Sequence, residues 1–258
     1  MSNQPLVNII ARDQYAIVQM NREKGNALNL ELLQELRRAF ADIEANPNFR
    51  GMILTGQPGY FSVGVDIVTM LQRDDQYYLD LWTEFSLMAI DLVKFRKPAI
   101  AAITGHSPAG GCVMAVACDY RYMAEGPKYR IGLNETRVGI PIPKYIFELY
   151  SFLIGKRHAY QYLLEGKMLS CEEALHSGLV DQLSTQEELL DLAEAKMQHL
   201  LEVPDNVLQA SKFNMRQNVI KVIDVDPTPG MQKRLKEWQD PANKQQMIEM
   251  VMKLRAKK

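Results

Sequence analysis

Two adjacent glycines have the setting of a catalytic backbone site. Gly110 and Gly111 follow a strand-like segment and precede the apolar run CVMAVAC, so they are expected to open a helix. The first N–H groups of a helix have no intrahelical partner and lie at the positive end of its dipole, which suits them to bind an oxyanion. A tight strand-to-helix turn that needs a positive φ would also account for the glycines.

A single glutamate is the candidate acid–base residue. Glu135 lies in a predicted turn between Gly132 and Gly139, where a carboxylate could act as a general base or could simply be solvated. The segment FSVGVDI at 61–67 also places a glycine in a loop without strong side-chain donors. Such a glycine indicates that the backbone itself approaches another group closely.

Several other kinds of site have no support in the sequence. The motifs GxxxxGK[ST], GxGxxG and GxSxG are missing, which argues against a phosphate loop, a dinucleotide fingerprint and a hydrolase elbow. The histidines do not have the spacing of metal ligands, and the cysteines lack a CxxC pair; they are His106, His158, His176, His199, Cys112, Cys118 and Cys171. We therefore expect no metal and no disulfide.

The composition is that of an ordinary globular chain. Of 258 residues, 47% are apolar and 24% are charged, and 30 basic against 31 acidic residues give a net charge of −1. This balance offers no bulk attraction for nucleic acid or an anionic membrane. The apolar runs are far shorter than the ~18 residues of a spanning helix. The N-terminal sequence has no targeting pattern, so a cytoplasmic location is expected.

Strand and helix signals alternate before a mostly helical end. β-Branched residues predict a hairpin from VNII and YAIVQM, and Asn29 is placed to cap a helix that ends before Pro47. The other expected elements are strands over 51–56 and 99–104, helices over 77–93 and 112–118, short strands at RYMA and KYRIG, and helices over 172–177, 187–201, 206–219 and 244–254. This order predicts an α/β protein with a soft boundary near residue 200.

Several separated segments together resemble a known enzyme family. They are NREKGNALN (21–29), FSVGVDI (61–67), AIAAITGHSPAGGC (99–112), ACDYRY (117–122) and ALHSGLVD (174–181). In this order they resemble the crotonase family of acyl-coenzyme A enzymes. The pieces PAGGC and IGLNET resemble most closely the Δ3,Δ2-enoyl-CoA isomerases.

The resemblance implies a fold and a set of catalytic groups. It implies a crotonase-like spiral of ββα units over 1–200 and a helical C-terminal module over 201–258 that mediates trimer formation. It also implies that the N–H groups of Val65 and Gly110 bind the thioester oxygen and that Glu135 is the base. The hydratases of the family carry a second glutamate on the helix after the glycines, where this sequence has Val113.

The resemblance further implies that the substrate is an acyl-CoA thioester, so no separate cofactor is expected. The residues implied to contact substrate or coenzyme A are Ala27, Val63, Gly64, Val65, Asp66, Ile67 and Asn134. Arg22, Lys24 and Lys212 are candidates for phosphate contacts, and each is equally well explained as a solvated charge.

The leading hypothesis is an isomerase of β-oxidation that shifts a 3-enoyl-CoA double bond to 2-trans-enoyl-CoA through a dienolate, with Glu135 as base and acid. One alternative is a crotonase of different chemistry, a hydratase or a thioester hydrolase. Another is a non-catalytic scaffold or RNA-binding member. Apolar positions in the last predicted helix favour a homotrimer or hexamer; they are Met247, Met250, Val251 and Leu254.

Overall fold

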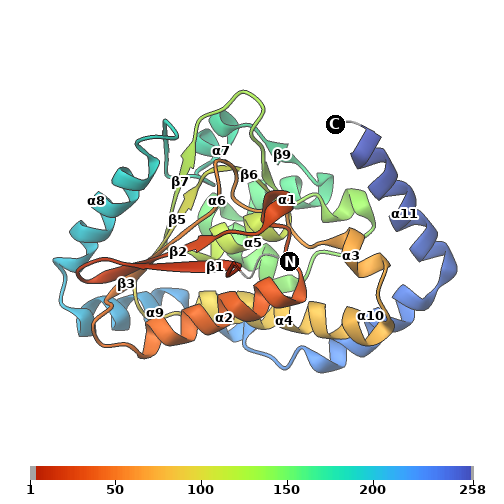
Figure 1. Cartoon of the computed structure of the whole chain (residues 1–258), viewed down its shortest axis with the longest axis horizontal. Helices are drawn as coiled ribbons and strands as arrows, with labels where there is room; N and C mark the ends of the chain where they lie inside the picture. The colour runs from red at the N-terminus through yellow and green to blue at the C-terminus, as the bar shows by residue number, and fades with distance from the viewer. Residues whose placement is uncertain (1–3, 257–258) are drawn as a thin grey trace.

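The chain alternates short strands with helices before it ends in a helical tail, as Figure 1 shows for the computed structural model, which describes residues 4–256. The strands are β1 (Val7–Ala11), β2 (Tyr15–Met20), β3 (Gly51–Thr55), β4 (Gly59–Tyr60), β5 (Ala99–Ile103), β6 (Gly105–Pro108), β7 (Tyr120–Ala124), β8 (Ile131–Gly132), β9 (Met168–Leu169) and β10 (Gln182–Ser184). The helices are α1 (Glu23–Asn26), α2 (Leu30–Ala45), α3 (Ile67–Leu71), α4 (Asp75–Lys94), α5 (Gly110–Ala117), the 3₁₀ turn η1 (Glu135–Val138), α6 (Lys144–Glu165), α7 (Cys171–Ser177), α8 (Leu189–Leu201), α9 (Asp205–Ile223), α10 (Thr228–Gln239) and α11 (Pro241–Ala256).

Two sheets are built by a repeated unit that gives one strand to each. Within the described residues, the larger sheet has the order β1-β2-β3-β5-β7-β10 and the smaller has the order β4-β6-β8-β9. In the larger sheet, the hairpin of β1 and β2 is antiparallel, and β2, β3, β5, β7 and β10 pair in parallel. The series β3-β4-α4, β5-β6-α5 and β7-β8-α6 repeats the same path, with α3 inserted before α4. The predicted α/β spiral of ββα units is confirmed.

The local signals read from the sequence place most elements correctly. The side chain of Asn29 accepts a hydrogen bond from Leu32 N and caps α2, as predicted. The KYRIG segment is shorter than predicted, because only Ile131–Gly132 pairs as a strand. The sequence pattern does not give the bounds of α6, because Gly155 (φ 76°) kinks this helix and interrupts its apolar periodicity. The helix α10 was not predicted, and its few buried residues leave a weak pattern.

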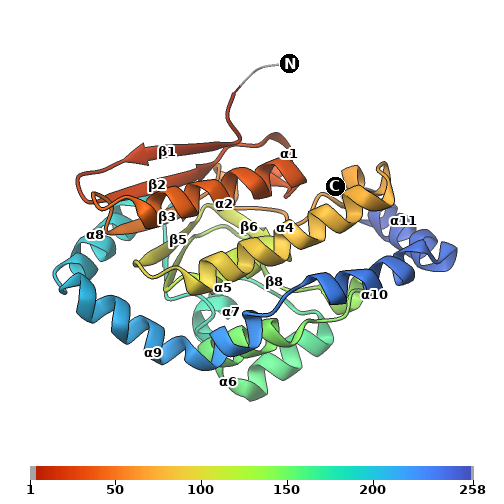
Figure 2. The ribbon, with the colours of Figure 1, turned by 90° about the horizontal axis from the view of Figure 1, so that it is seen from below.

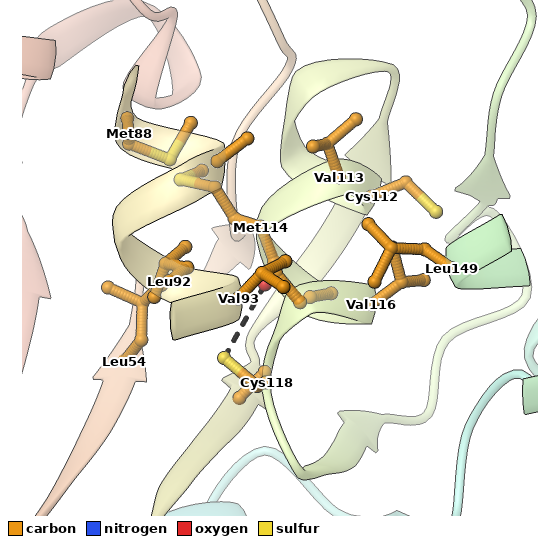
Figure 3. Packing of buried hydrophobic residues seen from close by; sticks show 14 of the residues in the cluster. Leu54, Met88, Leu92, Val93, Cys112, Val113, Met114, Val116, Cys118 and Leu149 are labelled. Atoms are coloured by element: carbon orange, nitrogen blue, oxygen red, sulfur yellow. Dashed lines mark hydrogen bonds between the residues drawn. The ribbon is translucent and has the colours of Figure 1, made fainter. Parts of the chain in front are cut away.

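The helix α5 lies at the centre of the core, and all its residues are buried. Figure 3 shows Met88, Leu92 and Val93 of α4 on one side of it and Leu149 of α6 on the other. Its small side chains let both helices pack closely around it. The core therefore fixes the start of α5, where Gly110 lies.

The helices after residue 200 share this core. Val219, Ile220 and Ile223 of α9 and Met231 and Trp238 of α10 belong to the same buried cluster as the strands of the larger sheet. Figure 2 shows α10 running beside α4. The division at residue 200 stays a prediction.

No helix in the described part of the chain is both long and apolar enough to cross a membrane.

A largely buried group of charges ties α9 to the start of β5 and to the end of α5. The Asp119 carboxylate lies 2.7 Å from Lys212 Nζ and 3.0 Å from Arg216 Nη2, and it accepts a hydrogen bond from Ala99 N. Burial alone would raise the pKa of Asp119, but Lys212 and Arg216 outweigh it and lower the pKa from its ordinary value. Lys212 also donates to Lys97 O at 2.7 Å. The suggestion that Lys212 contacts a phosphate is therefore wrong, because its ammonium is buried and paired.

We predict that Asp119→Asn lowers the free energy of unfolding by about 3–5 kcal/mol, because it leaves two buried cations without their anion. The matched control is Asp224→Asn, which breaks the exposed Lys94–Asp224 pair (N–O distance 2.9 Å) and should cost about 0–1 kcal/mol. Urea unfolding of both variants measures the difference. Equal midpoints would show that the buried cluster does not stabilise the fold.

Candidate active site

A cavity of about 1000 Å³ contains nearly all the residues predicted for the site. Those that line it are Ala27, Val63, Val65, Asp66, Ile67, Gly110, Asn134 and Glu135. Gly64 does not line it but lies directly behind Gly110. The wall also includes Pro143 and residues that sequence reasoning missed, which are Tyr60, Val68, Trp82, Phe85, His106, Pro108, Ala109, Lys128, Val138, Ile140, Ile142, Tyr145, Ile146 and Arg234.

The backbones of Gly64 and Gly110 are in close contact. A Cβ atom on Gly64 would lie 3.0 Å from Gly110 N and 2.9 Å from the Cβ of Ala109, and Gly64 has a φ of +82°. Any other residue at Gly64 would therefore clash and be strained. This contact brings the N–H groups of Val65 and Gly110 to the same part of the cavity wall. Neither N–H donates to an acceptor among the described residues, so both are free to donate to a ligand.

Ala109 turns the chain from β6 into α5 in an unusual conformation. Its φ of 50° and ψ of −122° are rare for a residue with a Cβ atom, and such strain typically costs about 1–3 kcal/mol. Ala109 N donates to Gly132 O at 2.9 Å, and Val113 N donates to Ala109 O at 3.0 Å. These bonds hold the turn in place and thereby orient the N–H of Gly110.

An ion pair joins the two loops that were predicted to hold coenzyme A. Arg22 Nη2 lies 2.7 Å from Asp66 Oδ2, and Arg22 Nη1 donates to Ala27 O at 2.6 Å. The loops also bond directly, because Leu28 N donates to Gly64 O and Asp66 N donates to Leu28 O. Arg22 therefore positions these loops and does not line the cavity. The side chain of Lys24 lies outside the described part of the structure.

Glu135 has the properties of a general base. It begins the turn η1, its own carbonyl accepts from Ile140 N, and its Oε2 is buried without a hydrogen-bond partner in the described residues. Burial raises the pKa of Glu135 to about 7. A carboxyl group with this pKa can both accept and donate a proton near neutral pH.

Glu135 is the unpaired carboxylate of this cavity. Asp66 also lines it, but Asp66 is paired with Arg22 and caps α3 through Thr69 N. Val113 presents an apolar side chain to the cavity from α5 and is 2% exposed. No group of three or more His, Cys, Asp or Glu side chains in the described residues could hold a metal ion. The site can therefore stabilise an oxyanion and move one proton.

Comparison with known proteins identifies the family. The model of the enoyl-CoA hydratase/isomerase family matches residues 12–246. Mitochondrial enoyl-CoA delta isomerase 1 of Mus musculus is 36% identical over 82% of this chain and 75% of its own length. A probable enoyl-CoA hydratase of Mycobacterium leprae is 30% identical over 69% of this chain and 68% of its own. The crystal structure of human mitochondrial delta3-delta2-enoyl-CoA isomerase has a TM-score of 0.93 and 30% identity, covering 98% of this chain and 99% of that one.

These likenesses cover the segments that carry the site as well as the fold. They confirm the resemblance to the crotonases and, within them, to the Δ3,Δ2-enoyl-CoA isomerases. The chain therefore belongs, as an enzyme, to the enoyl-CoA hydratase/isomerase family.

Proposed function

We propose that the protein converts a 3-enoyl-CoA thioester into the 2-trans isomer through a dienolate. The observation that carries the proposal is one unpaired carboxylate, Glu135, in the same cavity as the free N–H groups of Val65 and Gly110. Enolisation places negative charge on the thioester oxygen, and one preorganised donor typically stabilises such a transition state by about 3 kcal/mol.

One carboxylate is enough to balance the proton transfers. Glu135 removes a proton from C2 of the thioester, the electrons of the broken C–H bond delocalise over the dienolate, and Glu135 returns the same proton to C4. The double bond moves from C3–C4 to C2–C3, and no water, metal or cofactor takes part. Coenzyme A enters only as a part of the substrate, and such a step belongs to β-oxidation of unsaturated acyl chains.

The lining of the cavity favours isomerisation over hydration. Val113, Ile140 and Ile142 present apolar side chains where a water-binding site would need polar groups. Hydration remains the second candidate because the Mycobacterium leprae relative is named a probable hydratase. The free donors and the unpaired base argue against a non-catalytic scaffold.

Lys128, which lines the cavity and is exposed, is a better candidate for a phosphate contact than Lys212.

Assembly into a trimer or hexamer is part of the same proposal. Met247 packs partly against the core of its own chain, and the side chains of Met250, Val251 and Leu254 lie outside the described residues. The apolar surface that supports assembly is therefore on α6, where Phe152, Tyr160 and Leu164 are 52%, 60% and 62% exposed.

The mouse and human relatives are mitochondrial by name, and the cytoplasmic location stays a prediction for this chain.

We predict that Glu135→Gln lowers isomerisation of 3-enoyl-CoA by about 10²- to 10⁴-fold and leaves acyl-CoA binding nearly unchanged, because the amide cannot accept the C2 proton. Because the ionised form is the base, the wild-type rate should fall as the pH decreases through about 7, the pKa of Glu135. Absorbance of the conjugated product measures the rate. The control Glu165→Gln, at an exposed glutamate outside the cavity, should keep wild-type turnover. Full turnover in Glu135→Gln would contradict the mechanism.

We predict that the protein adds water to 2-enoyl-CoA very slowly and that Val113→Glu raises this rate. A glutamate at this wall position could hold a water together with Glu135. The gain should be small, since two carboxylates in one cavity raise each other's pKa. Val113→Gln is the matched neutral control and should give no gain. Wild-type hydration as fast as that of a typical hydratase would instead favour the hydratase alternative.

We predict a trimer or hexamer in solution and a shift toward the monomer in Leu164→Glu. A charge on this exposed position would have to be desolvated on association, whereas it should cost the folded monomer little. Light scattering at micromolar concentration measures both masses. A monomeric wild type would exclude the assembly.

A further inference from the structure

The cavity wall continues from the oxyanion donors to a polar end that the proposed isomerisation does not use. A Cβ atom on Gly110 would lie 2.9 Å from Phe85 Cε2, and the rings of Phe85 and Trp82 are 5.7 Å apart between centroids. The Arg234 guanidinium lies 5.6 Å from the centroid of Trp82. Gly110, Phe85, Trp82 and Arg234 all line the cavity, so these contacts trace a path along one wall.

Two hydrogen-bond donors at this end have no acceptor. Trp82 is 8% exposed, and its Nε1 is buried without a partner among the described residues. Arg234 forms no ion pair or hydrogen bond within the described residues, although Glu237 is one turn further along α10. A buried indole N–H without an acceptor costs free energy unless a ligand or water supplies one.

The surrounding elements hold both groups in the cavity. Trp238 of α10 stacks on Tyr78 of α4, with ring centroids 4.8 Å apart, and Tyr78 contacts Trp82 edge-on at 6.3 Å. Figure 2 shows α10 lying along α4 on the same side of the molecule. Because these rings fix α10 against α4, Arg234 is directed at the cavity by packed structure and not by a loose surface helix.

The charges of both Arg234 and Glu135 act on the Tyr145 hydroxyl group. Burial raises the pKa of Tyr145 to about 12, the charge of Arg234 opposes this shift, and the charge of Glu135 adds to it. The cation is therefore close enough to affect the cavity interior. Its charge and the Trp82 N–H together suit an anionic acceptor, and a carboxylate provides two oxygens that can accept from both groups.

We propose that this end of the cavity is a subsite for an acyl chain that carries a carboxylate at its far end, so that the enzyme prefers ω-carboxy-3-enoyl-CoA thioesters. The subsite comprises Arg234 and Trp82 Nε1. The proposal rests on the proposed isomerase function for its turnover assay, and it makes a separate statement about binding.

The test compares ω-carboxy-3-enoyl-CoA with the matched ω-carboxamide over a series of chain lengths. The amide has the same shape without the charge. At one or more lengths the carboxylate should have a kcat/KM about 10- to 100-fold higher. Calorimetry with the saturated ω-carboxyacyl-CoA and its amide should show the same preference in Kd without any turnover.

Variants assign the preference to named groups. Arg234→Gln should bring the carboxylate-to-amide ratio close to one, and Arg234→Lys should restore part of it, since lysine keeps the charge without the planar fork. Trp82→Phe should lower the ratio about 5-fold by removing one donor. Lys233→Gln, at an exposed neighbour outside the cavity, is the matched control and should leave the ratio unchanged.

The outcomes separate the two proposals. If the neutral chains are isomerised and no carboxylate chain is preferred in kcat/KM or Kd, the subsite is wrong. If Arg234→Gln weakens carboxylate, amide and free coenzyme A equally, Arg234 contacts a phosphate and the subsite is also wrong. If no thioester is isomerised but the Kd preference is present and depends on Arg234, the proposed function fails and the subsite stands.

Discussion

The contact between the backbones of Gly64 and Gly110 is the constraint on which the site depends. Two loops that are far apart in sequence must approach so closely that neither position has room for a side chain. The N–H groups of Val65 and Gly110 then share one part of the cavity wall, and donors held in place in this way are the condition for effective stabilisation of an oxyanion. The bridge of Leu28 to the first loop and the strained turn at Ala109 both preserve this approach. The complete burial of α5 holds Gly110 in place from the side of the core.

Local signals were sufficient for several elements around the site, among them the helix that begins at Gly110. A helix cap at Asn29, a β-branched hairpin and glycines before an apolar run are short-range features, and the structure follows them. The turn between Gly132 and Gly139 made Glu135 a candidate base or a solvated carboxylate, and only the resemblance chose between the two, because nothing in the sequence states that this turn faces a cavity. The side chains of Trp82 and Arg234 meet across more than half of the chain, and no local pattern encodes that contact. Lys212 was assigned a surface role because its type is usually solvated, whereas its actual environment is set by Asp119.

Two partly buried carboxylates in this fold have opposite pKa shifts. Asp119 is surrounded by cations and donors, so its pKa is lowered and its charge stabilises the packing of α9. Glu135 has one oxygen without a partner, so burial raises its pKa to about 7. An unpaired buried carboxyl group weakens folding but leaves the proton mobile. The difference separates a residue that holds the structure from one that can react.

The anchoring of Asp119 also has a consequence for how the chain is made. Lys212 lies 93 residues after Asp119 in the sequence, and Arg216 follows it. During synthesis the N-terminal part of a protein leaves the ribosome first. A nascent chain that has emerged only as far as α8 therefore holds a carboxylate whose two cations are not yet available. Docking of α9 supplies them, so the spiral gains this stabilising contact only after the segment that carries Lys212 and Arg216 has emerged.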